Sequence, residues 1–248
     1  METTNIIRPR VFVLNDSQKD RIHTDSLDIL STVGVRVESE KARRIFSKKT
    51  GSSVVHDDIV YIPPELVHDA LEMAPSSIEI YNRKGDLAFQ LPGETRFGIG
   101  VTDLYYQAPE SDKVVPFTRK NMELAVRLGD NLPSFDVIST IGILQDIHVK
   151  ALDVYSILEM TSNTTKPLVV LVSADNAFLS VIQLMEHLYG DLSSKPFIIP
   201  FVTPIAPLVI NRGTVAKMII ASEHGLPVIY SCGGIAGASA PITVAESL

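Results

Sequence analysis

Hydrophobic positions follow two different patterns along this chain. Residues 1–94 alternate between charged and apolar positions with helical periodicity, whereas residues 95–248 contain short apolar runs separated by amphipathic stretches. The first pattern predicts an N-terminal helical region, and the second predicts repeated strand–helix units. We therefore expect two domains, over residues 1–94 and 95–248.

The N-terminal region is predicted to contain three helices and a hairpin. Asp16 or Ser17 is expected to cap the first helix, which Gly34 would end. The second and third helices are expected over 37–51 and 63–75, the latter with proline in its first turn. The alternating segment "IEIYNRKGDLAFQL", at 78–91, is typical of a hairpin.

Five apolar runs in the second region lack clean alternation, which is typical of parallel strands buried on both faces. They lie at 95–100, 136–141, 167–173, 197–203 and 226–232. Helical patterns separate them, at 118–130, 146–163, 175–190 and 211–225. The later strands recur at roughly 30 residues, the size of a βα unit. The longer first interval contains "DLYYQAPESDKVVPF", which predicts an inserted hairpin.

The residue types in the loops after the strands favour an α/β fold of the (β/α)8 TIM-barrel type over an open doubly wound sheet. Small and polar residues follow each strand, and a new helical pattern begins at Pro241 and is interrupted by the last residue. Because a (β/α)8 barrel needs eight units, we interpret the chain as a barrel truncated after about five βα units. Its ligand site is expected at the carboxyl ends of the strands.

Composition narrows the function classes. The net charge of -7, without a basic run, argues against nucleic-acid binding. The single cysteine and the charged or proline-interrupted apolar runs indicate a cytoplasmic protein with no membrane segment. The six histidines form no paired metal motif, so we expect no metal site. No strand ends in a lysine, which argues against an aldolase of the Schiff-base type.

The strand ends supply the candidate substrate-binding residues. Their small or polar side chains leave room for a ligand, and an acid beside tyrosines suits a cation through charge neutralisation and cation–π contact. The candidates are Gly100, Thr102, Asp103, Tyr105, Thr140, Ser173, Thr203, Cys232 and Gly233. The alternatives are that the tyrosines belong to a plain amphipathic hairpin and that Cys232 is a buried apolar residue. No catalytic residue can be assigned.

Five segments resemble the trimethylamine methyltransferase family of corrinoid-dependent amine methyltransferases. They are "IPPELVHDALEMAP", "VPFTRKNMELAVRLGDNLPSFD", "NTTKPLV", "TPIAPL" and "AGASAPITVA", in that order along the chain. The resemblance implies a (β/α)8 barrel with an N-terminal helical region, about twice as long as this chain. It also implies transfer of a methyl group from a tertiary or quaternary amine, such as trimethylamine or glycine betaine.

The acceptor that the resemblance implies is Co(I) of a corrinoid on a separate partner protein, so no cofactor would be bound directly. The unpaired edges of a barrel cut after five strands further predict a homo-oligomer. The alternative function is a non-catalytic remnant that binds a cation or a partner chain.

Overall fold

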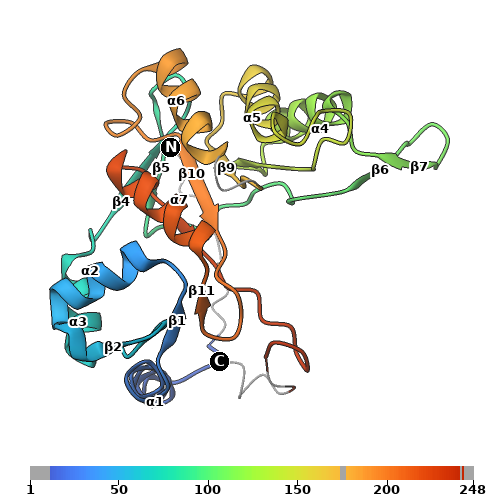
Figure 1. Ribbon diagram of the computed structural model, residues 1–248. Coiled ribbons are helices and arrows are strands. Elements are labelled where there is room, and N and C mark those ends of the chain that lie inside the picture. Colours follow the sequence, from blue (N-terminus) through green and yellow to red (C-terminus); the bar gives the residue numbers. More distant parts are fainter. Residues whose placement is uncertain (1–11, 174–176, 241, 243–248) are drawn as a thin grey trace, which may run out of the picture. The chain divides into compact units, whose positions relative to one another are not determined.

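The computed structural model describes residues 12–173, 177–240 and 242 (Figure 1). The chain is a mixed α/β protein that divides into two compact units. The first unit comprises Met1–Met73 with Gly234–Leu248, and the second comprises Ala74–Gly233. The predicted helix at Pro241 lies outside the described residues.

The first unit contains three helices and a small antiparallel sheet. Its elements are α1 (Asp16–Asp28), a π-helical turn (Ile29–Val33), β1 (Val35–Val37), α2 (Glu40–Thr50), a 3-10 turn (Ser52–Val54), β2 (Val55–His56), β3 (Ile59–Val60) and α3 (Pro64–Met73). Strands β1 and β2 each pair with β3. The three predicted helices are confirmed, but the predicted cap of the first is wrong. Asn15 caps α1, because its side chain accepts the N–H of Gln18, whose own side chain accepts the N–H of Asn15.

The second unit begins with two hairpins and continues with alternating strands and helices. Its elements are β4 (Ile78–Tyr81), β5 (Leu87–Leu91), β6 (Tyr105–Gln107), β7 (Val114–Pro116), α4 (Arg119–Asn131), β8 (Ile138–Ser139), α5 (Leu152–Asn163), β9 (Leu168–Val170), α6 (Ala177–Tyr189), β10 (Ile198–Val202), β11 (Val209–Ile210), α7 (Arg212–Glu223) and β12 (Ile229–Tyr230). Both predicted hairpins, β4–β5 and β6–β7, are confirmed. Figure 1 shows β6–β7 projecting away from α4 and α5.

Four strands of the second unit form a parallel sheet in the order β12-β10-β9-β8. The first predicted strand, over 95–100, is reduced to a single parallel bridge between Gly98 and Val137. The four strands lie in the sheet in the same order as along the chain, although β11, which is not part of this sheet, comes between β10 and β12. No closed barrel occurs among the described residues.

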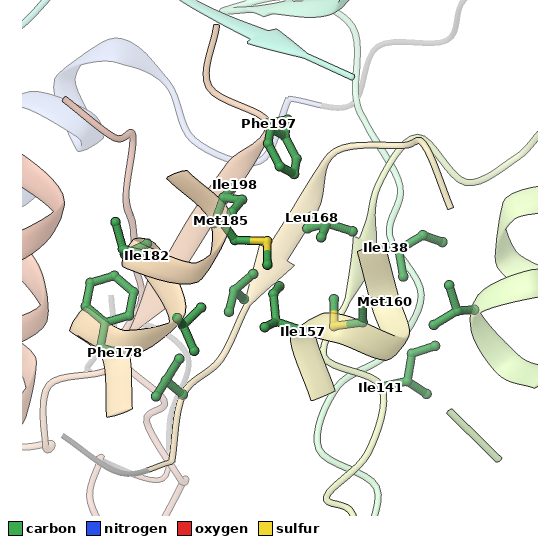
Figure 2. Packing of buried hydrophobic residues seen from close by; sticks show 14 of the residues in the cluster. Ile138, Ile141, Ile157, Met160, Leu168, Phe178, Ile182, Met185, Phe197 and Ile198 are labelled. Carbon is green, nitrogen blue, oxygen red and sulfur yellow. The ribbon is translucent and has the colours of Figure 1, made fainter. Parts of the chain in front are cut away.

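Helices α5 and α6 cover one face of this sheet and bury the main hydrophobic core. Figure 2 shows Ile157 and Met160 of α5, and Phe178, Ile182 and Met185 of α6, among the buried side chains of this core. All five side chains are at most 1% exposed. Helix α5 begins at Leu152 and not at the predicted residue 146, because residues 145–151 form turns after the preceding loop.

The β4–β5 hairpin packs against the other face of the sheet. Ile80 and Phe89 contact a second cluster that includes Val137, Val169 and Ile199. Main-chain hydrogen bonds join the hairpin to the amino ends of the strands, from Tyr81 N–H to the carbonyl of Pro196 and from Arg83 N–H to that of Thr165. The structure thus groups this hairpin with the strand–helix units. The predicted division at residue 94 stays a prediction.

Candidate functional site

The register of the parallel strands determines which side chains share the face opposite the helices. Val169 pairs with both Ser139 and Ile199, and Phe201 pairs with Ile229. Partners in a parallel pair point to the same face, and every second residue along a strand does so too. This face therefore contains Val169 of β9 and Leu171 just after it, and the chain bends at Ser173 two residues further on. The face likewise contains Ile199, Phe201 and Thr203 on the fourth predicted strand.

The polarity of this face changes along the strands. Val169 and Ile199 are buried against the β4–β5 hairpin, and Leu171, Phe201 and Ile229 pack partly buried beside them. Ser173, Thr203 and Ser231 follow the carboxyl ends of β9, β10 and β12 and are exposed. The face is thus apolar at its amino end and lined with hydroxyl groups at its carboxyl end. We call the residues at this carboxyl end the strand-end site.

Ser173 and Thr203 are held in the strand-end site by groups that come from the helices. The Ser173 N–H donates to Oδ1 of Asp153 (3.0 Å), a carboxylate of α5 that is only 5% exposed. The carbonyl of Thr203 accepts the hydroxyl of Thr214 (2.8 Å) and the side-chain amide of Asn211 (3.4 Å), at the start of α7. These bonds involve main-chain groups, so the hydroxyls of Ser173 and Thr203 are not consumed by them.

Thr140 has a different position from the other candidates. Its hydroxyl accepts the N–H of Leu171 (3.0 Å) and lies 3.8 Å from the sulfur of Met160. The side chain is 6% exposed and takes part in joining two strands. Its hydroxyl thus already has partners within the sheet and the helix layer.

The loop after the first predicted strand lies beside β8. Thr102 N–H donates to the carbonyl of Thr140 (3.0 Å), and Asp103 N–H to that of Ile141 (2.8 Å). Thr102 has a positive φ of 59°, and Gly100 has open space where a Cβ would be. The main chain therefore continues the parallel arrangement as far as Asp103, which forms a bridge with Gly142.

The two tyrosines that follow differ in their surroundings. Tyr106 packs against the main core, whereas Tyr105 is 61% exposed. The amphipathic-hairpin interpretation therefore holds for Tyr106. Asp103 and Tyr105 are both exposed and two residues apart in the chain, with a bend at Leu104 between them.

Cys232 and Gly233 end the second unit, and both are exposed. The interpretation of Cys232 as a buried apolar residue is therefore wrong. Burial raises the pKa of the Tyr230 phenol, and the neighbouring Cys232 raises it further. Tyr230 pairs with Val202, which points to the helix side of the sheet.

Three residues of this region escaped the sequence analysis. Asp153 gave no signal, because a buried aspartate that binds a neighbouring loop looks like any acidic residue in a first helical turn. Phe201 and Ser231 could have been found by extending the period-two pattern of β10 and β12 to the inward face.

The chemistry available at the strand-end site is binding by hydroxyl groups beside an apolar floor. In the part of the chain that the structure describes, no group of three or more histidine, cysteine, aspartate or glutamate side chains could hold a metal ion. No helix among the described residues is both long and apolar enough to cross a membrane. Asp103, in the loop beside β8, is an exposed acidic residue, which suits a cationic ligand.

Comparison with known proteins gives one consistent family. A sequence model described as trimethylamine methyltransferase (MTTB) matches residues 2–248. Trimethylamine methyltransferase MttB of Desulfitobacterium hafniense (strain DSM 10664 / DCB-2) is 28% identical over 241 residues, covering 94% of this chain and 48% of that protein. Trimethylamine methyltransferase MttB of Methanosarcina barkeri (strain Fusaro / DSM 804) is 26% identical, covering 92% of this chain and 48% of that protein.

A relative with a different named substrate also matches. Glycine betaine methyltransferase of Desulfitobacterium hafniense (strain Y51) is 20% identical over 246 residues, covering 97% of this chain and 50% of that protein. The chain thus spans about half the length of the curated relatives it matches. Because the family model matches nearly every residue, the chain belongs to the trimethylamine methyltransferase (MTTB) family.

Proposed function

We propose that this chain is the amino-terminal half of a (β/α)8 barrel that transfers a methyl group from a tertiary or quaternary amine to a Co(I) corrinoid on a partner protein. The observation that carries the proposal is the family match over residues 2–248. The sequential order of the parallel strands supports the barrel, because a doubly wound sheet reverses its strand order at a switch point.

The reaction proposed is a nucleophilic displacement at carbon. The bond between the methyl carbon and nitrogen breaks with its electron pair staying on nitrogen, and the Co(I) corrinoid of the partner supplies the electron pair of the new bond. A tertiary amine must carry a proton to be a leaving group, whereas a quaternary amine is already cationic. The protein must therefore hold a cation with one methyl group facing outward, which requires positioning and electrostatic stabilisation.

Asp103 and Tyr105 are the residues of this half that suit the cation. Asp103 supplies a negative charge, and the exposed ring of Tyr105 supplies a cation–π surface two residues away. The hydroxyls of Ser173 and Thr203 would orient the polar end of the amine. Gly100 and Gly233, which are exposed and without side chains, leave the strand ends accessible to a wide, flat corrinoid.

The test uses the complete protein with its corrinoid partner. The Asp103→Asn and Tyr105→Ala variants should bind glycine betaine or trimethylamine about 1–2 kcal/mol more weakly, the size of a desolvated cation–π contact. Glu110→Gln, at the exposed tip of the same hairpin, is the charge-matched control and should bind as the wild type does. Binding is followed by calorimetry and methyl transfer by the visible spectrum of the corrinoid.

Two results would contradict the proposal. Unchanged affinity in both variants would remove Asp103 and Tyr105 from the site. A complete protein that binds the amine and never methylates a corrinoid partner would instead be the non-catalytic cation binder that the sequence also allows.

A further inference from the structure

A cavity lies at the amino ends of the strands, at the end of the sheet opposite the strand-end site. Its volume is about 340 Å³. It is bounded by the turn of the β4–β5 hairpin and by the segment between α6 and β10. The lining residues are Asn82, Arg83, Lys84, Gly85, Tyr189, Asp191, Leu192, Ser194, Lys195 and Phe197. All of them belong to the second unit.

The charges around this cavity are unbalanced. Three cationic side chains, those of Arg83, Lys84 and Lys195, face one carboxylate, that of Asp191. Among the described residues, none of the three cations has a carboxylate oxygen within 4.0 Å. The cavity therefore carries an excess of two positive charges, in a chain whose net charge is -7.

Two of the cations are held in place by neutral partners. Arg83 donates from Nε to the carbonyl of Thr164 (3.0 Å) and from Nη1 to the hydroxyl of Tyr189 (3.4 Å), and its guanidinium lies 5.6 Å from the centre of the Tyr189 ring. Lys195 donates from Nζ to the carbonyl of Gly85 (2.8 Å). Each cation keeps further N–H groups, so both are positioned without having their charge neutralised.

The carboxylate of Asp191 accepts hydrogen bonds from within its own loop. Its Oδ1 accepts the N–H of Ser193 (2.9 Å) and the hydroxyl of Ser193 (2.7 Å). These hydrogen bonds lower the pKa of the Asp191 carboxyl, so it stays ionised. Asp86, next to the hairpin turn, accepts a hydrogen bond from the Asn82 side chain (3.1 Å) and does not line the cavity.

We propose that this cavity binds a small phosphate monoester. A phosphate dianion matches the excess of two positive charges, and arginine with lysine is the usual set of donors for such an oxyanion. The ring of Tyr189 packs edge to face against the buried ring of Phe197, with centres 5.4 Å apart, and supplies an apolar wall for the group that carries the phosphate. The site is independent of the proposed methyl transfer, because it lies at the other end of the strands.

The proposal is tested on the 248-residue chain with two probes, inorganic phosphate and phenyl phosphate. Phosphorus NMR titration and calorimetry should show one saturable site for each, with phenyl phosphate binding more tightly because of the aromatic wall. Lys84→Gln and Lys195→Gln should each weaken binding about three- to tenfold, the loss of one charge-assisted contact. Raising the ionic strength should weaken it further.

Lys113→Gln is the matched control, because Lys113 is an exposed lysine at the tip of the β6–β7 hairpin and not part of the cavity. It should bind both probes as the wild type does, and circular dichroism verifies the fold of every variant. Absence of saturable binding at millimolar probe, or an equal loss in Lys113→Gln, would overturn the site. Binding of inorganic phosphate with equal or greater affinity than phenyl phosphate would overturn the assignment to a monoester.

Discussion

Asp153 allows a direct test of how the strand-end site is held together. Its carboxylate is 5% exposed and accepts the Ser173 N–H at 3.0 Å. A hydrogen bond to a charged acceptor contributes about 1.5–3 kcal/mol to stability. Ser173 itself is exposed, so water can reach its N–H once the carboxylate is removed. We therefore expect Asp153→Ala to cost near the lower end of that range, about 2 kcal/mol.

Asp153→Asn separates the hydrogen bond from the negative charge. The asparagine keeps one acceptor oxygen for Ser173 and should cost about half as much as alanine, roughly 1 kcal/mol. Asp69→Ala, on the exposed side of α3, is the matched control and should change stability by less than about 0.5 kcal/mol.

Urea unfolding of the 248-residue chain measures these differences. At a slope of about 3 kcal/mol per molar urea, a loss of 2 kcal/mol lowers the midpoint by roughly 0.7 M. Hydrogen exchange of the Ser173 amide should accelerate in Asp153→Ala and much less in Asp153→Asn. If Asp153→Ala unfolds at the wild-type midpoint and Ser173 exchanges at the wild-type rate, the carboxylate does not hold the strand end.

Three further predictions concern the hairpin, the assembly and the closing turn. Phe89→Ala should lower the free energy of unfolding by about 3–5 kcal/mol, because the ring is 7% exposed within the cluster against the sheet. Urea unfolding measures the loss, with Leu91→Ala as the control because Leu91 is 39% exposed, and an equal loss in both variants would contradict the prediction. Light scattering should find the 248-residue chain as an oligomer, since a sheet with open edges pairs with other chains, and a well-folded monomer would contradict this. In the complete protein, Ala236→Leu should slow methyl transfer at least tenfold, about 1.4 kcal/mol of barrier, with amine binding unchanged. Ala236 is exposed in the turn where Gly237 has φ 78°. Transfer at the wild-type rate would show that the corrinoid does not dock on this turn.

The segment "NTTKPLV" resembles the family, yet its side chains have a structural role and do not belong to the strand-end site. The Thr164 hydroxyl donates to Asp130 at the end of α4 (2.5 Å), and Lys166 donates to the carbonyls of Gly129 (2.8 Å) and Leu132 (2.9 Å). Lysine at a helix C-terminus satisfies carbonyls that have no partner in the helix. The motif therefore joins a helix end to the start of β9, at the end of the sheet away from the strand-end site.

The sequence by itself determined most of the helices and hairpins of this protein. Periodicity located the three N-terminal helices, the hairpins β4–β5 and β6–β7 and four of the five predicted parallel strands, because burial on one or two faces is a local property of the pattern. It did not reveal the short strands β1, β2, β3 and β11. Thr118 and Asn211, which begin two of the predicted helical segments, cap α4 and α7, because each side chain accepts the backbone N–H three residues on. The inward face of each strand could also be derived from alternation, once its register was known.

Only the tertiary structure decided which side chains meet. Asp153 holds Ser173 across 20 residues, and Arg83 contacts Thr164 across 81. Thr140 and Ser173 look equivalent in sequence, since each is a small hydroxyl residue at the end of an apolar run. Thr140 uses its hydroxyl between two strands, whereas Ser173 is exposed at the strand end. Contacts between distant segments depend on strand register and helix packing, which no local pattern of residues encodes.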